Sequence, residues 1–136
     1  YLSPDRKTLR RVTTGLVKPN GIIGTPDGRT LFVADIRGNK TYAFDIQPDG
    51  NLANQRLFCE QGSDGMTLDT EGRLYLTGKG VSVFDASGKK IEQIDVPESW
   101  TAKLCFGGRD HKTLFITASE GLYAIRLRTR GANAAK

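Results

Sequence analysis

The sequence predicts an all-β protein, a six-bladed β-propeller of which this 136-residue chain supplies about three blades. Short runs rich in β-branched and aromatic residues recur along the chain and alternate with Asp-Gly, Asn-Gly and Ser-Gly turn pairs, whereas helical periodicity is hard to find. Similar segments begin at Asn20 and Asp64, 44 residues apart, and a third begins near Lys103, 39 residues further on. Repeats of this length with four strands each are typical of propeller blades.

The expected strands are apolar runs bounded by turn residues. Gly next to Asp, Asn, Glu or Ser favours the tight turns that join neighbouring antiparallel strands. In order, the strands are expected at residues 21–24, 30–35, 41–46, 56–60, 66–69, 73–77, 81–85, 91–96, 104–106, 113–118 and 122–127.

The repeat divides the chain into parts. Residues 1–14 are expected to form the outer hairpin of a preceding blade, and residues 15–61 and 62–99 two complete blades. Residues 100–130 form a last, three-stranded blade, followed by a tail at residues 131–136. Propellers typically have about 4–8 blades, and three blades alone would leave open edges. We therefore expect a missing N-terminal half, or a second copy of the chain, to close the ring.

The composition limits the kinds of partner that the protein is expected to bind. The formal charge is +5, but Lys and Arg are scattered over turns apart from Arg126, Arg128 and Arg130. On a strand, this alternate spacing would put the three arginines on one face. Without an aromatic-rich basic stripe, a solvated basic face is expected rather than a nucleic-acid or membrane partner. No apolar run approaches the ~20 residues of a membrane span. We expect a soluble protein and leave its compartment open between cytoplasm and periplasm or secretion.

Two cysteines occur in strand-like runs. Cys59 and Cys105 are not part of a Cys-x-x-Cys motif or a Cys/His cluster. They are expected to be buried free thiols. The single histidine, His111, lies in a polar turn and is expected to be solvated, so no Ser-His-Asp or Cys-His catalytic group is predicted.

Asn20 and Asp64 are the residues best suited to bind a metal ion or to take part in catalysis. Both are hard oxygen donors at the start of a repeat, and such donors favour Ca²⁺, Mg²⁺ or Mn²⁺ over metals that prefer thiolates. Zn²⁺ can also take such a site. Asp64 is the candidate general base. The alternative is that the Asn-Gly and Asp-Gly pairs only form tight turns at the entrances of the blades.

Six ordered stretches carry a family resemblance. They are residues 18–22 (Lys-Pro-Asn-Gly-Ile), 31–35 (Leu-Phe-Val-Ala-Asp), 62–66 (Gly-Ser-Asp-Gly-Met), 74–77 (Leu-Tyr-Leu-Thr), 105–108 (Cys-Phe-Gly-Gly) and 114–117 (Leu-Phe-Ile-Thr). With them the chain resembles the C-terminal half of the gluconolactonase and senescence marker protein (regucalcin)-like family.

The resemblance implies a function and a site. The family's six-bladed propeller holds one divalent metal on its axis, here expected to be Ca²⁺, and hydrolyses sugar lactones such as glucono-1,5-lactone. Asn20 and Asp64 match two of the family's metal ligands, and the third, a Glu, has no counterpart in this chain. The chain alone is therefore expected to be inactive. The alternatives are a non-catalytic binding scaffold with a structural metal, and a related esterase of broader lactone or phosphotriester range.

Two residues near the third repeat leave alternatives open. The family usually has Thr-Asn or Thr-Ser before its Phe-Gly-Gly motif, whereas this chain has Ala102-Lys103. Lys103 is expected either to lie at the level of Asn20 and Asp64, where it would contact substrate and repel a dication, or to turn toward the rim. Trp100 is expected to pack between blades, with a stacking site for a sugar as the alternative.

Overall fold

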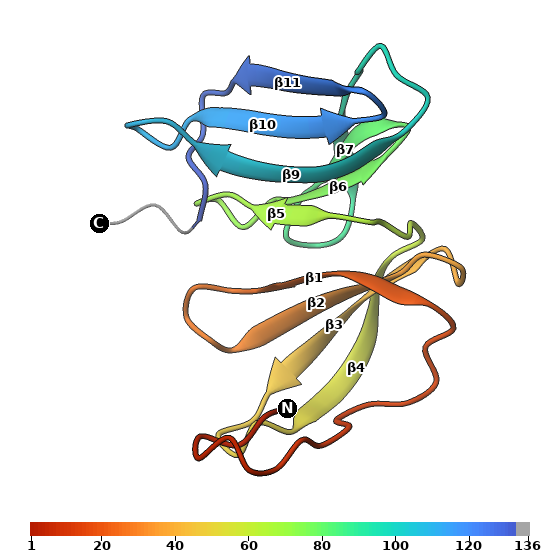
Figure 1. Ribbon diagram of the computed structural model, residues 1–136, viewed down its shortest axis with the longest axis vertical. Coiled ribbons are helices and arrows are strands. Elements are labelled where there is room, and N and C mark those ends of the chain that lie inside the picture. Colours follow the sequence, from red (N-terminus) through yellow and green to blue (C-terminus); the bar gives the residue numbers. More distant parts are fainter. Residues whose placement is uncertain (133–136) are drawn as a thin grey trace.

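The computed structural model describes residues 1–132, which contain eleven β-strands in three antiparallel sheets and no helix (Figure 1). No helix suited to crossing a membrane therefore occurs in this part of the chain. Each sheet is a meander in which consecutive strands are hydrogen-bonded neighbours. The all-β class and the blade-like sheets expected from the sequence are confirmed.

The first sheet follows the chain order β1-β2-β3-β4. Its strands are β1 (Pro19–Gly24), β2 (Thr30–Asp35), β3 (Lys40–Ile46) and β4 (Leu52–Cys59). The second sheet has the order β5-β6-β7-β8. Its strands are β5 (Met66–Leu68), β6 (Leu74–Gly78), β7 (Gly80–Phe84) and β8 (Lys90–Ile94).

The third sheet has only three strands, in the order β11-β10-β9. They are β9 (Thr101–Gly107), β10 (Thr113–Ala118) and β11 (Gly121–Arg126). β11 forms the outer edge and exposes Leu122 and Ile125. After β11 the chain leaves the sheet and pairs beside β5, where the Thr70 N–H donates to the Arg130 carbonyl at 2.9 Å.

The expected N-terminal hairpin and C-terminal tail are described to different extents. Near the N-terminus, Leu2 and Leu9 form an isolated antiparallel bridge, which joins the two arms of a short loop. That this loop belongs to a preceding blade stays a prediction. Of the expected tail, Gly131 bridges Asp69, and residues 133–136 lie outside the described part of the chain.

Two hydrophobic clusters join the three sheets. Phe32 and Ala34 of the first sheet pack with Met66, Leu74 and other residues of the second. The second cluster joins the second and third sheets and contains Tyr75, Val81, Val83, Leu104, Leu114 and Ile116. These contacts hold the inner strands β1, β5 and β9 side by side (Figure 1). Residues at the starts of different repeats are thereby brought together.

An aspartate at the end of β5 stabilises the turn that follows it. Asp69 is buried, and its Oδ1 accepts the N–H groups of Glu71 and Arg73, both at 2.9 Å. Its Oδ2 accepts Arg73 Nε at 2.6 Å. Gly72 closes the same turn with a φ of 75°, a left-handed conformation that glycine adopts without strain.

The expectation that both cysteines are buried is wrong for one of them. Cys59 is buried, whereas Cys105 is exposed. Side chains alternate between the faces of a strand. In β9, Leu104 therefore points into the cluster with the second sheet, and Cys105 points to the opposite face of the third sheet, which no other described sheet covers.

Candidate functional site

Asn20 and Asp64 meet across two neighbouring blades. Asn20 is the second residue of β1, and Asp64 lies in the segment that leads into β5. The Asn20 amide Nδ2 donates to Asp64 Oδ1 at 2.5 Å, although 44 residues separate them in sequence. The main chain fixes this approach, because the Gly21 N–H donates to the Ser63 carbonyl at 3.0 Å. The structure thus brings the two predicted ligands together; their roles stay a prediction.

The two glycines of the Asn-Gly and Asp-Gly pairs allow the inner strands to come close. Neither Gly21 nor Gly65 has a positive φ, so neither is required by a left-handed turn. A Cβ on Gly65 would lie 2.6 Å from the Ala102 carbonyl oxygen and 2.9 Å from Lys103 Cα. The backbone therefore does not form the tight turns that were the alternative interpretation of these two pairs.

A buried polar network holds the segment that carries Asp64. Ser63 and Thr77 are fully buried. The Gly65 N–H donates to Thr77 Oγ1 at 2.9 Å, and the Thr77 N–H donates to Ser63 Oγ at 2.9 Å. Buried polar groups that are fully paired in this way fix a single local structure. The sequence does not single out these hydroxyls, because Ser and Thr occur throughout the chain.

Trp100 makes a contact with Asp64 that the sequence does not predict. Its indole Nε1 donates to Asp64 Oδ2 at 2.7 Å. The side chain is 41% exposed, so the expectation that Trp100 packs between blades is wrong. Trp100 directly precedes β9, and the close approach of β9 to Gly65 brings its indole to the Asp64 carboxylate. Nothing in the local sequence distinguishes this arrangement from interblade packing.

Lys103 lies at the level of Asn20 and Asp64. Its ammonium Nζ donates to the main-chain carbonyl of Asp64. The alternative orientation, toward the rim, is not the one observed. The three oxygens of Asp64 therefore each accept a hydrogen bond from a different side chain: Oδ1 from Asn20, Oδ2 from Trp100 and the carbonyl from Lys103.

These residues supply part of a ligand set for a hard divalent cation. Carboxylate and amide oxygens are the ligands that Ca²⁺ and Mg²⁺ prefer. Asp64 supplies the first, and the Asn20 amide is already within 2.5 Å of it. Within residues 1–132 no three or more His, Cys, Asp and Glu side chains gather at one place. The pair therefore fits such a cation only together with ligands from elsewhere.

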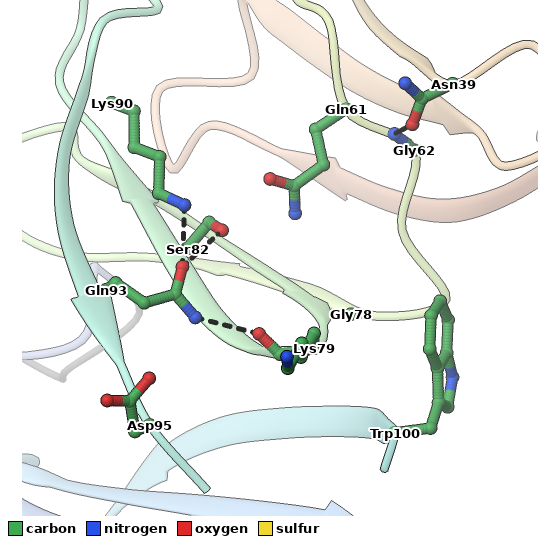
Figure 2. Close-up of a pocket in the computed structure, with 10 residues that line it drawn as sticks. All are labelled: Asn39, Gln61, Gly62, Gly78, Lys79, Ser82, Lys90, Gln93, Asp95 and Trp100. Atoms are coloured by element: carbon green, nitrogen blue, oxygen red, sulfur yellow. Dashed lines mark hydrogen bonds between the residues drawn. The ribbon is translucent and has the colours of Figure 1, made fainter.

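A polar cavity lies next to Trp100. Its volume is about 440 Å³, and Trp100 forms part of its wall (Figure 2). Gln93 lines the cavity. Its Oε1 accepts a hydrogen bond from Lys90 Nζ at 2.6 Å, and its Nε2 donates one to the Lys79 carbonyl at 2.8 Å. Gln61 projects into the same space (Figure 2). Trp100 is thus shared by the cavity and the Asp64 cluster, and the side chains around it suit a ligand rich in hydroxyl groups.

The arginine run does not form one face of a strand. β11 ends at Arg126, and Arg128 and Arg130 lie beyond it. Arg126 and Arg128 line a separate cavity of about 350 Å³. Arg126 Nη2 is paired with Asp110 Oδ2 at 2.5 Å. The expectation of one strand face is therefore wrong, because the chain leaves the sheet after Arg126.

Residues 1–120 match the family described as the SMP-30/Gluconolactonase/LRE-like region. The chain belongs to this family. It is 32% identical over 132 residues to regucalcin from Gallus gallus. That match covers 89% of this chain and 44% of the relative. The chain therefore spans less than half the length of this family member.

Solved structures of the family have the same arrangement of sheets. A gluconolactonase from Xanthomonas campestris is 32% identical, with a TM-score of 0.80 over 92% of this chain and 42% of that one. Regucalcin from Agrobacterium tumefaciens, described as a calcium-binding protein, is 24% identical, with a TM-score of 0.72 over 85% of this chain and 47% of that one. The second likeness concerns the fold alone.

Proposed function

We propose that this family member hydrolyses sugar lactones such as glucono-1,5-lactone to the aldonic acid, with the help of one divalent cation. The contact between Asn20 Nδ2 and Asp64 Oδ1 at 2.5 Å carries the proposal, because it brings together on an exposed surface an amide and a carboxylate, two side chains that can each offer a hard oxygen. The gluconolactonase from Xanthomonas campestris supports the choice of reaction. Carboxylate and amide oxygens favour a hard cation, and we place Ca²⁺ ahead of Zn²⁺, Mg²⁺ or Mn²⁺ on this ground.

Asn20 and Asp64 would hold the cation together with a carboxylate from outside this chain. When bound, the cation supplies positive charge that polarises a carbonyl and lowers the pKa of water. The third ligand would come from a preceding segment or from a second copy, and either would also close the ring.

Asp64 would act as the general base. It would take a proton from the water that attacks the lactone carbonyl carbon, and when the ring ester C–O bond breaks it would return that proton to the freed alkoxide. The Asn20 amide and the Trp100 indole, which donate to the two carboxylate oxygens, orient that base. Lys103, whose ammonium has further N–H groups beside the one given to Asp64, would contact the substrate.

The test is lactone hydrolysis by the closed assembly, formed by two copies or by this chain with the segment that supplies the remaining blades. Replacing Asp64→Asn should lower the rate above the uncatalysed background by about 100-fold or more, since a general base contributes ~10²–10⁴-fold. Glu120→Gln, in an exposed turn, is the matched control and should keep the wild-type rate. Wild-type activity in Asp64→Asn would refute the proposal.

A further inference from the structure

Asp64 is fully engaged by donors from this chain alone. Of its three side-chain partners, Asn20 and Trp100 are neutral, and only Lys103 carries a charge. Lys103 is thus a positive charge beside the carboxylate that we propose as a cation ligand. The family resemblance does not account for this lysine, since the matching position usually carries Asn or Ser.

The position of Lys103 is set by the packing of two blades. Its main-chain N–H donates to Thr117 Oγ1 at 3.1 Å within the third sheet. Its Cδ lies 3.1 Å from the point that a Cβ on Gly65 would occupy, so the stem of the side chain runs across Gly65. The ammonium is thereby led to the carbonyl of the preceding residue, Asp64.

We propose that the Lys103 ammonium competes with a divalent cation for the Asp64 site, so that this protein binds such a cation more weakly than a variant without the charge. The inference rests on the proposed cation site and adds a residue that regulates its affinity. A cation that engages Asp64 must either displace Lys103 or accept its repulsion.

Elementary electrostatics gives the size of the effect. Charges of +1 and +2 held roughly 6 Å apart repel one another, even with the full screening of water, by an amount equal to about a tenfold change in affinity. Displacement of a long lysine side chain relieves some of this repulsion at the cost of its hydrogen bond. Removing the charge should therefore tighten cation binding by about tenfold, without any new ligand.

The neutral donors do not obscure this comparison. Asn20 and Trp100 each donate one hydrogen bond to an Asp64 carboxylate oxygen, and each oxygen keeps a second lone pair that can face a cation. These hydrogen bonds are the same in the wild type and in a Lys103 variant, so the difference between them isolates the charge.

Trp100 provides a site-specific readout. It is the single tryptophan of the chain, and its indole nitrogen lies 2.7 Å from Asp64 Oδ2. Terbium, a Ca²⁺ mimic, luminesces when an excited indole lies close to it, so selective excitation of Trp100 reports a cation at Asp64. Addition of calcium then displaces terbium and yields the calcium affinity.

The experiment compares four forms of the chain, each in the closed assembly that supplies the further ligands of the site. Lys103→Gln should bind calcium about tenfold more tightly than the wild type, whereas Lys103→Arg, which keeps the charge, should not. Lys89→Gln removes the same charge from the far ends of the strands, in the turn between β7 and β8, and should match the wild type.

Equal calcium affinity in the wild type and Lys103→Gln overturns the inference, and so does equal tightening in Lys89→Gln. A complete lack of indole-sensitised luminescence in every form overturns it too. Lactone hydrolysis is measured separately, so an inactive protein in which Lys103→Gln still tightens calcium binding would refute the proposed reaction and leave the inference standing.

Discussion

The indole N–H of Trp100 donates a hydrogen bond to Asp64 Oδ2 at 2.7 Å, which ties the start of the third blade to the carboxylate at the start of the second. The two residues are 36 positions apart in sequence. Because the other carboxylate oxygen accepts the Asn20 amide, three successive blades contribute to the orientation of one side chain. The candidate site is thus a property of blade packing rather than of any single loop.

Replacing Trp100→Phe should lower the lactonase rate of the closed assembly by about tenfold, a loss of about 1.4 kcal/mol that suits one hydrogen bond to a charged group. The ring is retained and the side chain is half-exposed, so the thermal midpoint should change little. The measurement is kcat and KM beside a thermal melt. A rate equal to that of the wild type would show that Trp100 does not position Asp64.

Replacing Gly65→Ala should destabilise the fold by about 1–3 kcal/mol, because the new methyl group would overlap the Ala102 carbonyl, which is main chain and cannot rotate away. Gly24→Ala is the matched control, since a Cβ there meets its nearest neighbour at an ordinary 3.8 Å. Urea unfolding of both variants checks this. Equal stability of the two would contradict the close approach of β9 to Gly65.

The two cysteines should differ in reactivity in the native protein. Cys105 is exposed within the chain and open to a thiol reagent unless association covers its face, whereas burial raises the pKa of the Cys59 thiol and shields it. No more than one thiol per chain should therefore react before unfolding, and two after it. Rapid labelling of Cys59 in the native state would argue against the cluster between the first two sheets.

Asp35 should make stability depend on pH in the acid range. Burial alone would raise the pKa of Asp35, but main-chain N–H donors from Val17, Lys18 and Gly38 outweigh it and hold the pKa below the ordinary value of 3.8. The folded state thus releases this proton more readily than the unfolded chain. The stabilisation is present above pH 3.8 and is lost as the pH falls through the lowered pKa.

Replacing Asp35→Asn should therefore cost about 1–3 kcal/mol near neutral pH, since the amide accepts these N–H groups less well. The difference between wild type and variant should shrink below about pH 4. Denaturant unfolding across this range measures it. A difference that does not change with pH would exclude Asp35 as the titrating group.

The purified 136-residue chain should not behave as a 14.9 kDa monomer. Leu122 and Ile22 are 71% and 62% exposed, on sheet surfaces that no other part of residues 1–132 covers. Such faces associate in water. Light scattering should report a larger mass, and a fully soluble monomer would contradict the need for further blades.

Much of the fold could be predicted because each strand is bounded by residues with defined turn chemistry. Asp69 and Gly72 show why: the carboxylate caps the turn and the glycine takes the left-handed conformation. The proximity of Asn20 and Asp64 could be predicted from the repeat alone. In contrast, the partners of Asp64 depend on side-chain direction across a blade interface, which periodicity does not encode.

Trp100 and Cys105 illustrate that limit. An aromatic residue before a strand is most often packed between layers, yet here the indole reaches a carboxylate. A cysteine between Leu104 and Phe106 suits a buried strand, yet it lies on the face that the described sheets leave uncovered. Both outcomes depend on which neighbouring blades are present, and that information lies outside the local sequence.

The most direct test of the Asn20–Asp64 centre is glucono-1,5-lactone hydrolysis by the closed assembly after chelation and after return of Ca²⁺, with Asn20→Ala beside the wild type. We expect chelation to abolish the wild-type rate above background, Ca²⁺ to restore it, and Asn20→Ala to need a higher Ca²⁺ concentration. A chelated protein that keeps its full rate would contradict a cation-dependent centre at Asn20 and Asp64.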